Sequence, residues 1–452
     1  MSVYNRREFM RRGAAGAAGL GLILNGEPMA VEAASPLPRP AAPSDRVNVG
    51  FIGFGIRGNI LFERARKTGQ ANLVEVCDCY KGHLERAKER TDGKIDTNFA
   101  QYKKLLDRKD LDAVVIATPE HQHLPVFLDA IAAGKDVYIE KPMTHCIAEG
   151  PKMIEAARKA RRIVQVGSQG MSSSQNRMAK QMIAQGKLGK VTKVMAAYNR
   201  NSSTGAWNYP IPPDLKNGVN FKWEEWLGPA PQRPFDAERV FRWRKYWDYS
   251  GGITTDLFVH LITSIHYIMG ASMPTSVVAT GGILFRHDGR QDPDTIDALF
   301  DYPEGFHVNM ASSFNSSTAG VNGLRVLGTD GSLVMPMSER SMTYGVESHR
   351  EGYHYSIDSW PVALQKEFMN MDDHREKAAR TAPPSKNIPT KDSADATTLH
   401  MAEFFDCVRT RKQCSENAEV GSRAAAAGHM INLSYLSGKK AVWDPIAHKA
   451  LV

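Results

Sequence analysis

Residues 46–168 alternate short apolar runs with stretches in which apolar residues recur every three or four positions. Short apolar runs are typical of buried strands, and the longer repeat is typical of helices that bury one face. The predicted strands are residues 47–52, 73–77, 113–117, 136–139 and 163–166. The predicted helices are residues 60–68, 83–90, 102–107, 124–133 and 148–160. Strands that alternate with helices indicate right-handed βαβ units, so we expect a parallel sheet with helices on both faces.

After about residue 170 the alternation stops. A helix near residues 176–185 and a strand at 191–198 precede a long segment, 199–250, that is rich in aromatic residues. A helix at 256–268 is followed by predicted strands at 275–283, 295–301, 306–314 and 323–327. Consecutive strands without intervening helices favour an antiparallel sheet. The predicted fold class is therefore α/β, with residues 46–168 as the first domain and 169–452 as an α+β domain that carries a large, mostly antiparallel open sheet.

The end of the chain is predicted to be helical. Residues 338–395 are polar and irregular, and they are predicted to form surface excursions. Two helical patterns follow, near residues 399–409 and 421–436, and we expect these helices to pack back on the first domain.

The first 33 residues have the pattern of an export signal. Arg6 and Arg7 precede an apolar run of about twelve residues, 13–24, and residues 31–34 offer small side chains for cleavage. The run is shorter than the ~20 residues that a membrane span needs, but it suits a twin-arginine signal peptide. Residues 34–45 form a Pro- and Ala-rich linker. We therefore expect an exported, periplasmic protein that uses the twin-arginine machinery and has no stable membrane anchor.

Composition narrows the possible partners. The chain has 452 residues, enough for two domains, and a formal net charge of +8. The basic residues are scattered and no recognition motif accompanies them, so nucleic-acid binding is not expected. The cysteines lack the spacing of zinc ligands, and no metal site is predicted. Whether Cys407 and Cys414 pair is left open by the sequence.

A glycine-rich motif follows the first predicted strand. It reads Gly53-x-Gly55-x-x-Gly58 and leads into a helix, and Asp78 ends the second strand twenty residues later. Such a turn lets backbone and helix N-terminus approach a pyrophosphate, while the carboxylate accepts hydrogen bonds from ribose hydroxyls. A carboxylate would repel a 2′-phosphate, which favours NAD over NADP. Arg57, inside the loop, weakens that preference.

Two further motifs stand at the carboxyl ends of strands, where open α/β sheets place ligands. Thr118-Pro119-x-x-x-His123 follows the third strand, and Glu140-Lys141-Pro142 follows the fourth. Together with the glycine loop, these motifs resemble the Gfo/Idh/MocA oxidoreductases over nearly the whole chain after the linker. The resemblance implies a homo-oligomer assembled through the open sheet. It also implies a cofactor site made by Gly53, Gly55, Ile56, Arg57, Gly58, Asp78, Thr118, Pro119, His123, Glu140 and Lys141.

The same resemblance assigns catalytic roles. Lys141 would sit beside the nicotinamide and polarise the reacting oxygen. Asp256 and His260 are four residues apart, which places both on one helical face. By resemblance, His260 is the general base and Asp256 orients it or the substrate.

The segment 199–250 interleaves aromatic and basic residues. Aromatic faces and planar donors suit sugar rings, although the aromatic residues could equally fill a core. Trp207, Arg242 and Trp243 are the candidate substrate contacts.

Three functions remain open from the sequence. The first is an NAD-dependent oxidoreductase acting on a sugar, cyclitol or glycoside, with a tightly bound cofactor that leaves the cell with the folded protein. The second is a redox-neutral glycosidase or lyase that oxidises, eliminates and reduces, with Tyr198, Tyr209 or Tyr246 as an added acid or base. The third is a sugar-binding protein without catalysis.

Overall fold

The computed structural model describes residues 22–24, 27–29, 39–316, 322–337, 340–390 and 392–452. Arg6, Arg7 and the expected cleavage site lie outside the described residues, so the export signal stays a prediction. Two short strands near the N-terminus, β1 (Leu22–Leu24) and β2 (Glu27–Met29), pair antiparallel with each other. Within the described parts of the chain, no helix combines the length and apolar character that a bilayer span requires.

The first domain contains a six-stranded sheet in the order β5-β4-β3-β6-β7-β8, and every strand pair is parallel. Its strands are β3 (Val47–Ile52), β4 (Ala71–Asp78), β5 (Asp96–Phe99), β6 (Ala113–Ile116), β7 (Asp136–Ile139) and β8 (Val164–Val166). The connecting helices are α2 (Ile56–Thr68), α3 (Lys81–Glu89), α4 (Tyr102–Leu106), α5 (His123–Ala132) and α6 (Glu149–Ala160). The predicted parallel α/β domain is confirmed, although β5 was not predicted.

Helices cover both faces of this sheet because alternate strand residues point to opposite sides. Val49 and Phe51 of β3 pack in one cluster with α2, whereas Ile52 packs with α5 and α6 on the other face. The register pairs Ile52 with both Cys77 and Ile116. The carboxyl ends of β3, β4 and β6 therefore meet at one edge, which is where the predicted motifs lie.

The second domain is built on a ten-stranded sheet in the order β16-β15-β14-β13-β9-β12-β11-β10-β17-β18. Its strands are β9 (Val191–Ala197), β10 (Ser276–Gly282), β11 (Thr295–Asp301), β12 (His307–Ser313), β13 (Gly323–Gly328), β14 (Gly331–Pro336), β15 (Ser341–Val346), β16 (Lys386–Pro389), β17 (Ala441–Asp444) and β18 (Lys449–Leu451). All pairs are antiparallel except β12 with β9, which is parallel. This confirms the predicted mostly antiparallel sheet.

One face of the large sheet is covered and the other is open. Helices α7 (Ser174–Ala184), α10 (Val259–Met269) and α15 (Ala418–Ser437) bury residues of the first face, such as Val194 and Met310. On the opposite face Met195, Val278 and Leu299 are 37–57% exposed. Val278 and Leu299 pair across the neighbouring strands β10 and β11, and exposed apolar residues on one sheet face are typical of a protein-protein contact.

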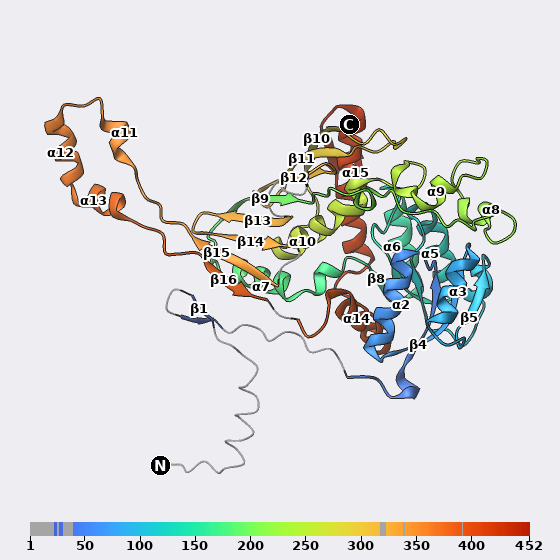
Figure 1. Cartoon of the computed structure of the whole chain (residues 1–452). Helices are drawn as coiled ribbons and strands as arrows, with labels where there is room; N and C mark the ends of the chain where they lie inside the picture. The colour runs from blue at the N-terminus through green and yellow to red at the C-terminus, as the bar shows by residue number, and fades with distance from the viewer. Residues whose placement is uncertain (1–21, 25–26, 30–38, 317–321, 338–339, 391) are drawn as a thin grey trace, which may run out of the picture.

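The prediction that residues 338–395 are irregular is wrong at both ends of this segment. β15 and β16 pair with each other and extend the sheet edge. Between them, α11 (Tyr353–Ile357), α12 (Val362–Asn370) and α13 (Asp372–Ala379) form an arm that stands away from the body of the molecule (Figure 1). Polar composition concealed these elements because edge strands and exposed helices bury few side chains.

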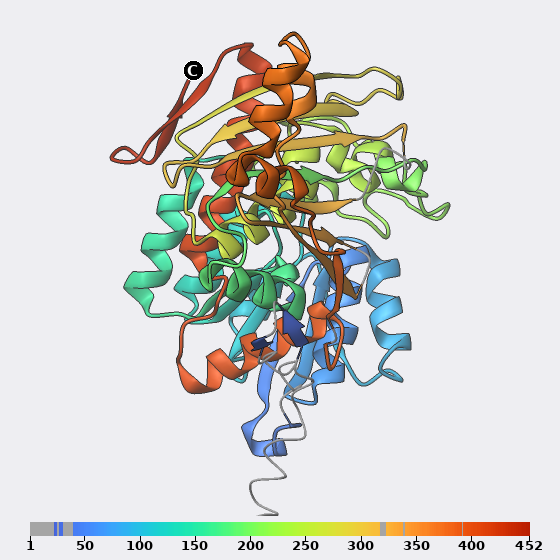
Figure 2. The same ribbon diagram turned by 90° about the vertical axis from the view of Figure 1, so that its left-hand side faces the viewer.

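The last helices join the two domains. Phe404 and Phe405 of α14 (Ala396–Thr410) pack in the same core as Val49 and Phe51 of β3. The longer α15 lies against both α6 of the first domain and β10 of the second, and it runs between the two sheets in Figure 2. Cys407 and Cys414 are buried as free thiols, so they do not form a disulfide here.

Candidate active site

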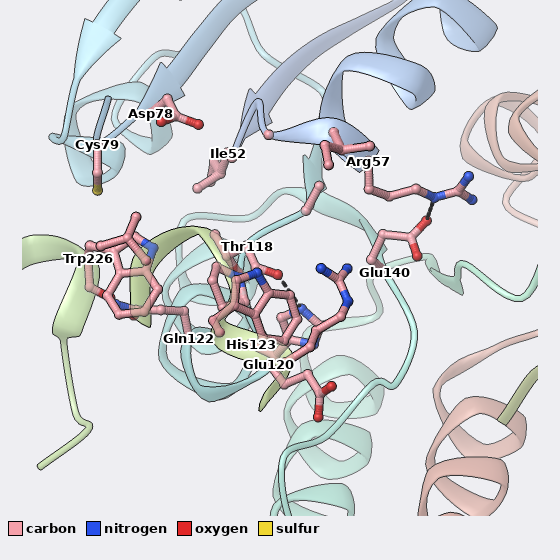
Figure 3. A pocket seen from close by; sticks show the side chains of 18 of the residues that line it. Ile52, Arg57, Asp78, Cys79, Thr118, Glu120, Gln122, His123, Glu140 and Trp226 are labelled. Atoms are coloured by element: carbon pink, nitrogen blue, oxygen red, sulfur yellow. Dashed lines mark hydrogen bonds and ion pairs between the residues drawn. The ribbon is translucent and has the colours of Figure 1, made fainter. Parts of the chain in front are cut away.

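A cavity of about 950 Å³ opens where the two domains meet. Residues directly after β3, β4, β6 and β7 line one side, and residues from the segment 198–260 line the other. In Figure 3, Asp78, Cys79 and Ile52 lie above the cavity, while Thr118, Gln122 and His123 lie below. All predicted cofactor residues line it except Gly58, which is buried behind the loop.

The glycine loop has the shape that its sequence requires. Gly53 has a φ of +90°, a conformation that side chains disfavour. A Cβ on Gly58 would collide with the carbonyl oxygen of Gly53, so this position holds helix and strand together. A Cβ on Gly55 would meet only the Cε1 atom of His83, at 3.8 Å, so the loop is open toward the cavity there.

Asp78 is held in place by groups of its own domain. Its Oδ2 accepts a hydrogen bond from the backbone N–H of Phe54 at 2.6 Å, and its Oδ1 accepts from that of Tyr80 at 2.8 Å. The His83 Nδ1 lies 3.1 Å from Oδ1. Burial alone would raise the pKa of Asp78, but His83 and these hydrogen bonds lower it below its ordinary value. The carboxylate is thus ionised and can accept hydrogen bonds from hydroxyls in the cavity.

The two other strand-end motifs are tied together by His123. Its Nδ1 lies 2.8 Å from the carbonyl oxygen of Pro142 and its Nε2 lies 3.1 Å from that of Thr118. Burial lowers the pKa of His123 to about 4, so the ring is neutral and donates to only one of these oxygens. His123 therefore lies between Thr118 and the Glu140-Lys141-Pro142 turn and fixes one of them by its single N–H.

Arg57 joins the glycine loop to the same turn. Its Nε donates to Glu140 Oε1 at 2.6 Å, a contact drawn as a dashed line in Figure 3, and its Nη2 donates to Gln169 at 3.0 Å. Because Glu140 already neutralises this guanidinium, Arg57 is less available to a cofactor phosphate than its place in the sequence indicates.

Lys141, Asp256 and His260 all line the same cavity. Lys141 Nζ donates to Asp256 Oδ1 at 2.7 Å and to the Asp256 carbonyl oxygen at 2.9 Å. The helix that carries Asp256 begins with a π-helical turn, η6 (Thr254–Phe258), and continues as α10. The sequence predicted one regular helix, and the structure instead begins it with this π-helical turn. Asp256 and His260 both still line the cavity.

The charges around Asp256 set its protonation and that of His260. Burial alone would raise the pKa of Asp256, but Arg244 and Lys141 outweigh burial and hold it well below its ordinary value. Burial and the Lys141 charge lower the pKa of His260 well below its usual value. At neutral pH, Asp256 is a carboxylate and His260 is a neutral imidazole that can accept a proton.

Two of the three residues predicted to contact sugar, Trp207 and Arg242, do not line the cavity. Trp207 has no exposed area and packs edge-to-face on Phe314 in the core of the second domain. Arg242 does not line the cavity, because it is bound to Glu238 at 2.6 Å and to the carbonyl oxygen of Tyr209 at 2.9 Å. Only Trp243 lines the cavity as expected.

Sequence reasoning missed Arg244. Its Nε donates to Asp256 Oδ1 at 2.9 Å, and its guanidinium lies 4.1 Å from the ring centre of Trp243. It therefore takes the place that Arg242 was expected to fill. Arg242 and Arg244 look alike in the sequence, and only the short turn η5 (Trp243–Lys245) decides which one faces the cavity.

Glu120 was also missed. It is buried, and its carboxylate accepts hydrogen bonds from Ser250 Oγ at 2.6 Å, Gly251 N–H at 3.0 Å and Thr255 Oγ1 at 3.1 Å. Burial raises the pKa of Glu120 to about 7. Because these donors lie within the six residues before Asp256, Glu120 positions the turn that leads into the helix of Asp256 and His260. The one signal in the sequence that pointed to Glu120 was its position within the Thr118–His123 motif.

The aromatic segment closes the cavity from the second domain. The carbonyl oxygen of Trp226, on α8 (Trp223–Leu227), accepts from Gln122 at 2.8 Å and lies 3.0 Å from His121 Nε2. Tyr80 donates its hydroxyl hydrogen to Asp214 at 2.6 Å. The segment is therefore bound to the first domain on the side of Asp78, where it covers the cavity.

Comparison with known proteins agrees with this geometry. The family description "Oxidoreductase family, NAD-binding Rossmann fold" matches residues 47–168, and "GFO/IDH/MocA C-terminal domain" matches residues 226–334. The chain belongs to the Gfo/Idh/MocA family. Its first domain is accordingly a nicotinamide-dinucleotide-binding domain of the Rossmann type.

Individual relatives differ in their named activities. An "Alpha-N-acetylgalactosaminidase" of Shewanella oneidensis is 29% identical over 229 residues, which cover 45% of this chain and 50% of the relative. The chain thus matches about half the length of this curated relative. Levoglucosan dehydrogenase, solved with NADH and levoglucosan, has a TM-score of 0.63 at 16% identity, over 87% of this chain and 98% of that one. Aldose-aldose oxidoreductase from Caulobacter crescentus also gives 0.63, at 18% identity, over 88% and 99%.

Proposed function

We propose that the protein is an NAD-dependent oxidoreductase that transfers hydride between a ring hydroxyl of a sugar, cyclitol or glycoside and a tightly bound cofactor. The observation that carries this proposal is a single cavity that is lined by the glycine loop and Asp78 and also by Lys141, Asp256 and His260. The two solved neighbours named above, which act on or bind sugars by their titles, support a carbohydrate substrate.

The residues present fit a dinucleotide. Thr118 Oγ1 is buried and has no hydrogen-bond partner among the described residues, so it is free to bind a ligand in the cavity. The space beside Gly55 is open, as a close-approaching pyrophosphate requires. Asp78 would accept hydrogen bonds from the adenosine ribose, which favours NAD over NADP. When bound, the nicotinamide supplies the hydride acceptor.

The chain's own groups would manage the proton and the oxygen. Lys141 is a donor of three N–H groups, and the hydrogen bonds to Asp256 use two of them. The third would hold the reacting oxygen. His260, being neutral, would take the hydroxyl proton as the C–H bond breaks, and it would return the proton in the reverse reaction. Asp256 keeps Lys141 and Arg244 in place.

Sugar binding would use the wall opposite the glycine loop. Trp243, Tyr198 and Tyr209 line this part of the cavity. Their rings offer apolar faces to the C–H groups of a sugar, and the tyrosine hydroxyls offer polar edges.

A redox-neutral glycosidase or lyase is the second candidate. The named activity of the Shewanella oneidensis relative favours it, and Tyr198 and Tyr209 line the cavity where an added acid or base would be needed. Tyr246 does not line the cavity but is packed beside Arg239. Among the three tyrosines proposed from sequence, the choice is thereby reduced to two.

The proposal includes an exported location and a homo-oligomer. The expectation of export by the twin-arginine route rests on residues 1–33. Export of the folded protein together with its cofactor would explain why the cofactor stays bound. Assembly through the open sheet face is supported by the exposed Met195, Val278 and Leu299.

The test uses the full-length protein as purified, without added nucleotide. A panel of sugars, cyclitols and glycosides is added while absorbance near 340 nm is followed. We expect a rise limited to about one equivalent per subunit with the right substrate. Release of aglycone without net reduction would select the glycosidase. A flat trace with every substrate, before and after addition of NAD, would contradict both activities.

A further inference from the structure

Three cations line the cavity around the catalytic carboxylate. They are Lys141, Arg200 and Arg244. Asp256 pairs with two of them through one oxygen, Oδ1. The other acid nearby, Glu120, points its oxygens at Ser250, Gly251 and Thr255. The substrate end therefore carries more positive charge than its own carboxylates balance.

Arg200 is the cation without an acidic partner. No carboxylate of the described residues lies within 4.0 Å of it, although Lys141 and Arg244 both have one. Its Nη1 donates to the carbonyl oxygen of Gly205 at 2.9 Å, and its guanidinium lies 5.2 Å from the ring centre of Tyr198. These contacts orient the guanidinium without neutralising it.

The backbone that carries Arg200 is fixed. The segment after β9 continues along β12, with Tyr198 N–H bonded to the Ala311 carbonyl at 3.1 Å and Arg200 N–H to that of Ser313 at 2.9 Å. Residues two apart on an extended chain share a face, and Tyr198 and Arg200 both line the cavity. Arg200 is thus a built part of the wall and not a mobile surface side chain.

Arg200 also lies within electrostatic reach of the catalytic groups. Its charge is one of those that lower the pKa of Asp256, after Arg244 and Lys141, and one of those that lower the pKa of His260, after burial, Lys141 and Arg57. A ligand group bound to Arg200 would therefore lie close to Asp256 and His260, the groups that would handle the reacting hydroxyl.

We propose that Arg200 forms a subsite for a carboxylate of the substrate, so that the preferred substrates are acidic sugars such as uronic acids and their glycosides. The inference rests on the proposed function and names its substrate class. A guanidinium matches a carboxylate through two parallel hydrogen bonds, and a partly buried cation is stabilised by such a partner. The oxidised nicotinamide ring is itself positive, so an anionic substrate would also offset the charge of the cofactor.

The test compares matched pairs that differ only at one carbon. Glucuronate and glucose, galacturonate and galactose, and the methyl glycosides of each pair are given to the purified holoprotein. We expect kcat/KM, measured as the second-order rate constant for reduction of the bound cofactor, to favour the acid by at least about tenfold. Replacing Arg200→Gln is expected to lower kcat/KM for the acid at least about tenfold more than for its neutral partner. Arg200→Lys is expected to restore part of the preference, because it keeps the charge and loses the fork.

Arg242→Gln is the matched control, since Arg242 lies outside the cavity. Its ratio of acid to neutral substrate should equal that of the wild type. The proposed subsite would be overturned if the wild type preferred the neutral sugars. It would also be overturned if Arg200→Gln lowered kcat/KM equally for both members of each pair. Thermal unfolding shows whether each variant is folded.

Titration calorimetry of the same acids and neutral sugars separates this inference from the proposed function. If no sugar reduces the cofactor but the acids alone bind, and bind more weakly to Arg200→Gln, the reaction is wrong and the carboxylate subsite stands. If neutral sugars react and bind as well as acids, the reaction stands and the subsite is wrong. If neither acids nor neutral sugars bind, the subsite is wrong.

Discussion

The charged side chains at the nucleotide end of the cavity are paired within that end, whereas those at the substrate end are not all neutralised. Asp78 is satisfied by Phe54, Tyr80 and His83, and Arg57 is paired with Glu140. At the other end Lys141 and Arg244 share one carboxylate and Arg200 has no acidic partner among the described residues. A site that binds one constant cofactor can be completed in advance, while a site for a charged substrate leaves part of its charge for that substrate.

The largest expected effect is at the reacting end. His260→Ala removes the proposed general base and should lower kcat by roughly 10²- to 10⁴-fold. Nucleotide bound to the purified variant, measured at 260 nm after denaturation, should equal that of the wild type, because no hydrogen bond among the described residues joins the His260 side chain to the glycine loop or to Asp78. A variant that keeps its rate, or one that loses the nucleotide as well, would show that the two ends do not divide the work as described.

A substitution in the glycine loop is expected to weaken nucleotide binding, in contrast to His260→Ala. In Gly55→Ala the new Cβ meets only His83 at 3.8 Å, so the fold should hold while the space for the pyrophosphate is filled. We expect nucleotide affinity to fall by about tenfold or more, with the thermal midpoint of the nucleotide-free protein unchanged.

Gly58→Ala serves as its counterpart, because its Cβ would collide with the Gly53 carbonyl oxygen and destabilise the domain itself. If Gly55→Ala unfolds as readily as Gly58→Ala, Gly55 has a structural role and the assignment to the cofactor is wrong.

Arg244 and Arg242 form a matched pair within one segment. Arg244→Gln removes the strongest of three cations, Arg244, Lys141 and Arg200, that hold the pKa of Asp256 low, so this pKa rises and the loss of activity at acid pH should begin at a higher pH. At neutral pH we expect kcat/KM to fall by about tenfold, the equivalent of about 1.4 kcal/mol. Arg242→Gln should stay within about twofold of the wild type with an unchanged pH profile. Equal pH profiles for the two variants would contradict the assignment of Arg244 to the site.

The smallest expected effect is a change in thermal stability that arises from Asp292, a residue outside the cavity. Asp292 is buried under Gly252, and neither of its carboxylate oxygens has a partner among the described residues. Burial raises the pKa of Asp292 to about 8 from an ordinary value of 3.8. The native state therefore keeps a proton that the unfolded state releases, and stability falls as pH rises from about 4 to 8. Asp292→Asn should raise the thermal midpoint by about 2 °C at pH 8 relative to the wild type.

The gain from Asp292→Asn should shrink toward pH 5, where the native carboxyl group is protonated and resembles the amide. Differential scanning calorimetry at the two pH values measures the difference. A gain of equal size at both would mean that burial of a charge is not its cause.

Residues close in sequence were the predictable part of the fold and the site. The alternation of strands and helices over residues 46–168 gave the parallel sheet, and the glycine loop, Asp78, Thr118 and Lys141 all fall at strand ends that face the cavity. The strands β15 to β18 were not predicted, because they lie at or near sheet edges and bury few positions. β14 was also missed, although its buried positions alternate. Trp207 was assigned to substrate because aromatic residues of a core and of a binding site look the same in sequence.

The sequence by itself determined the family, the two kinds of sheet and the residues that follow the strand ends, because backbone conformation and alternating burial depend on neighbours along the chain. The tertiary structure decided that Arg244 and not Arg242 meets Asp256, that Glu120 supports the turn before it, and that Arg200 faces the cavity without an acidic partner. These facts depend on side chains from segments up to 135 residues apart in the sequence, Glu120 to Thr255. Charge pairing is a property of distance in space, which a sequence does not contain until the chain has folded.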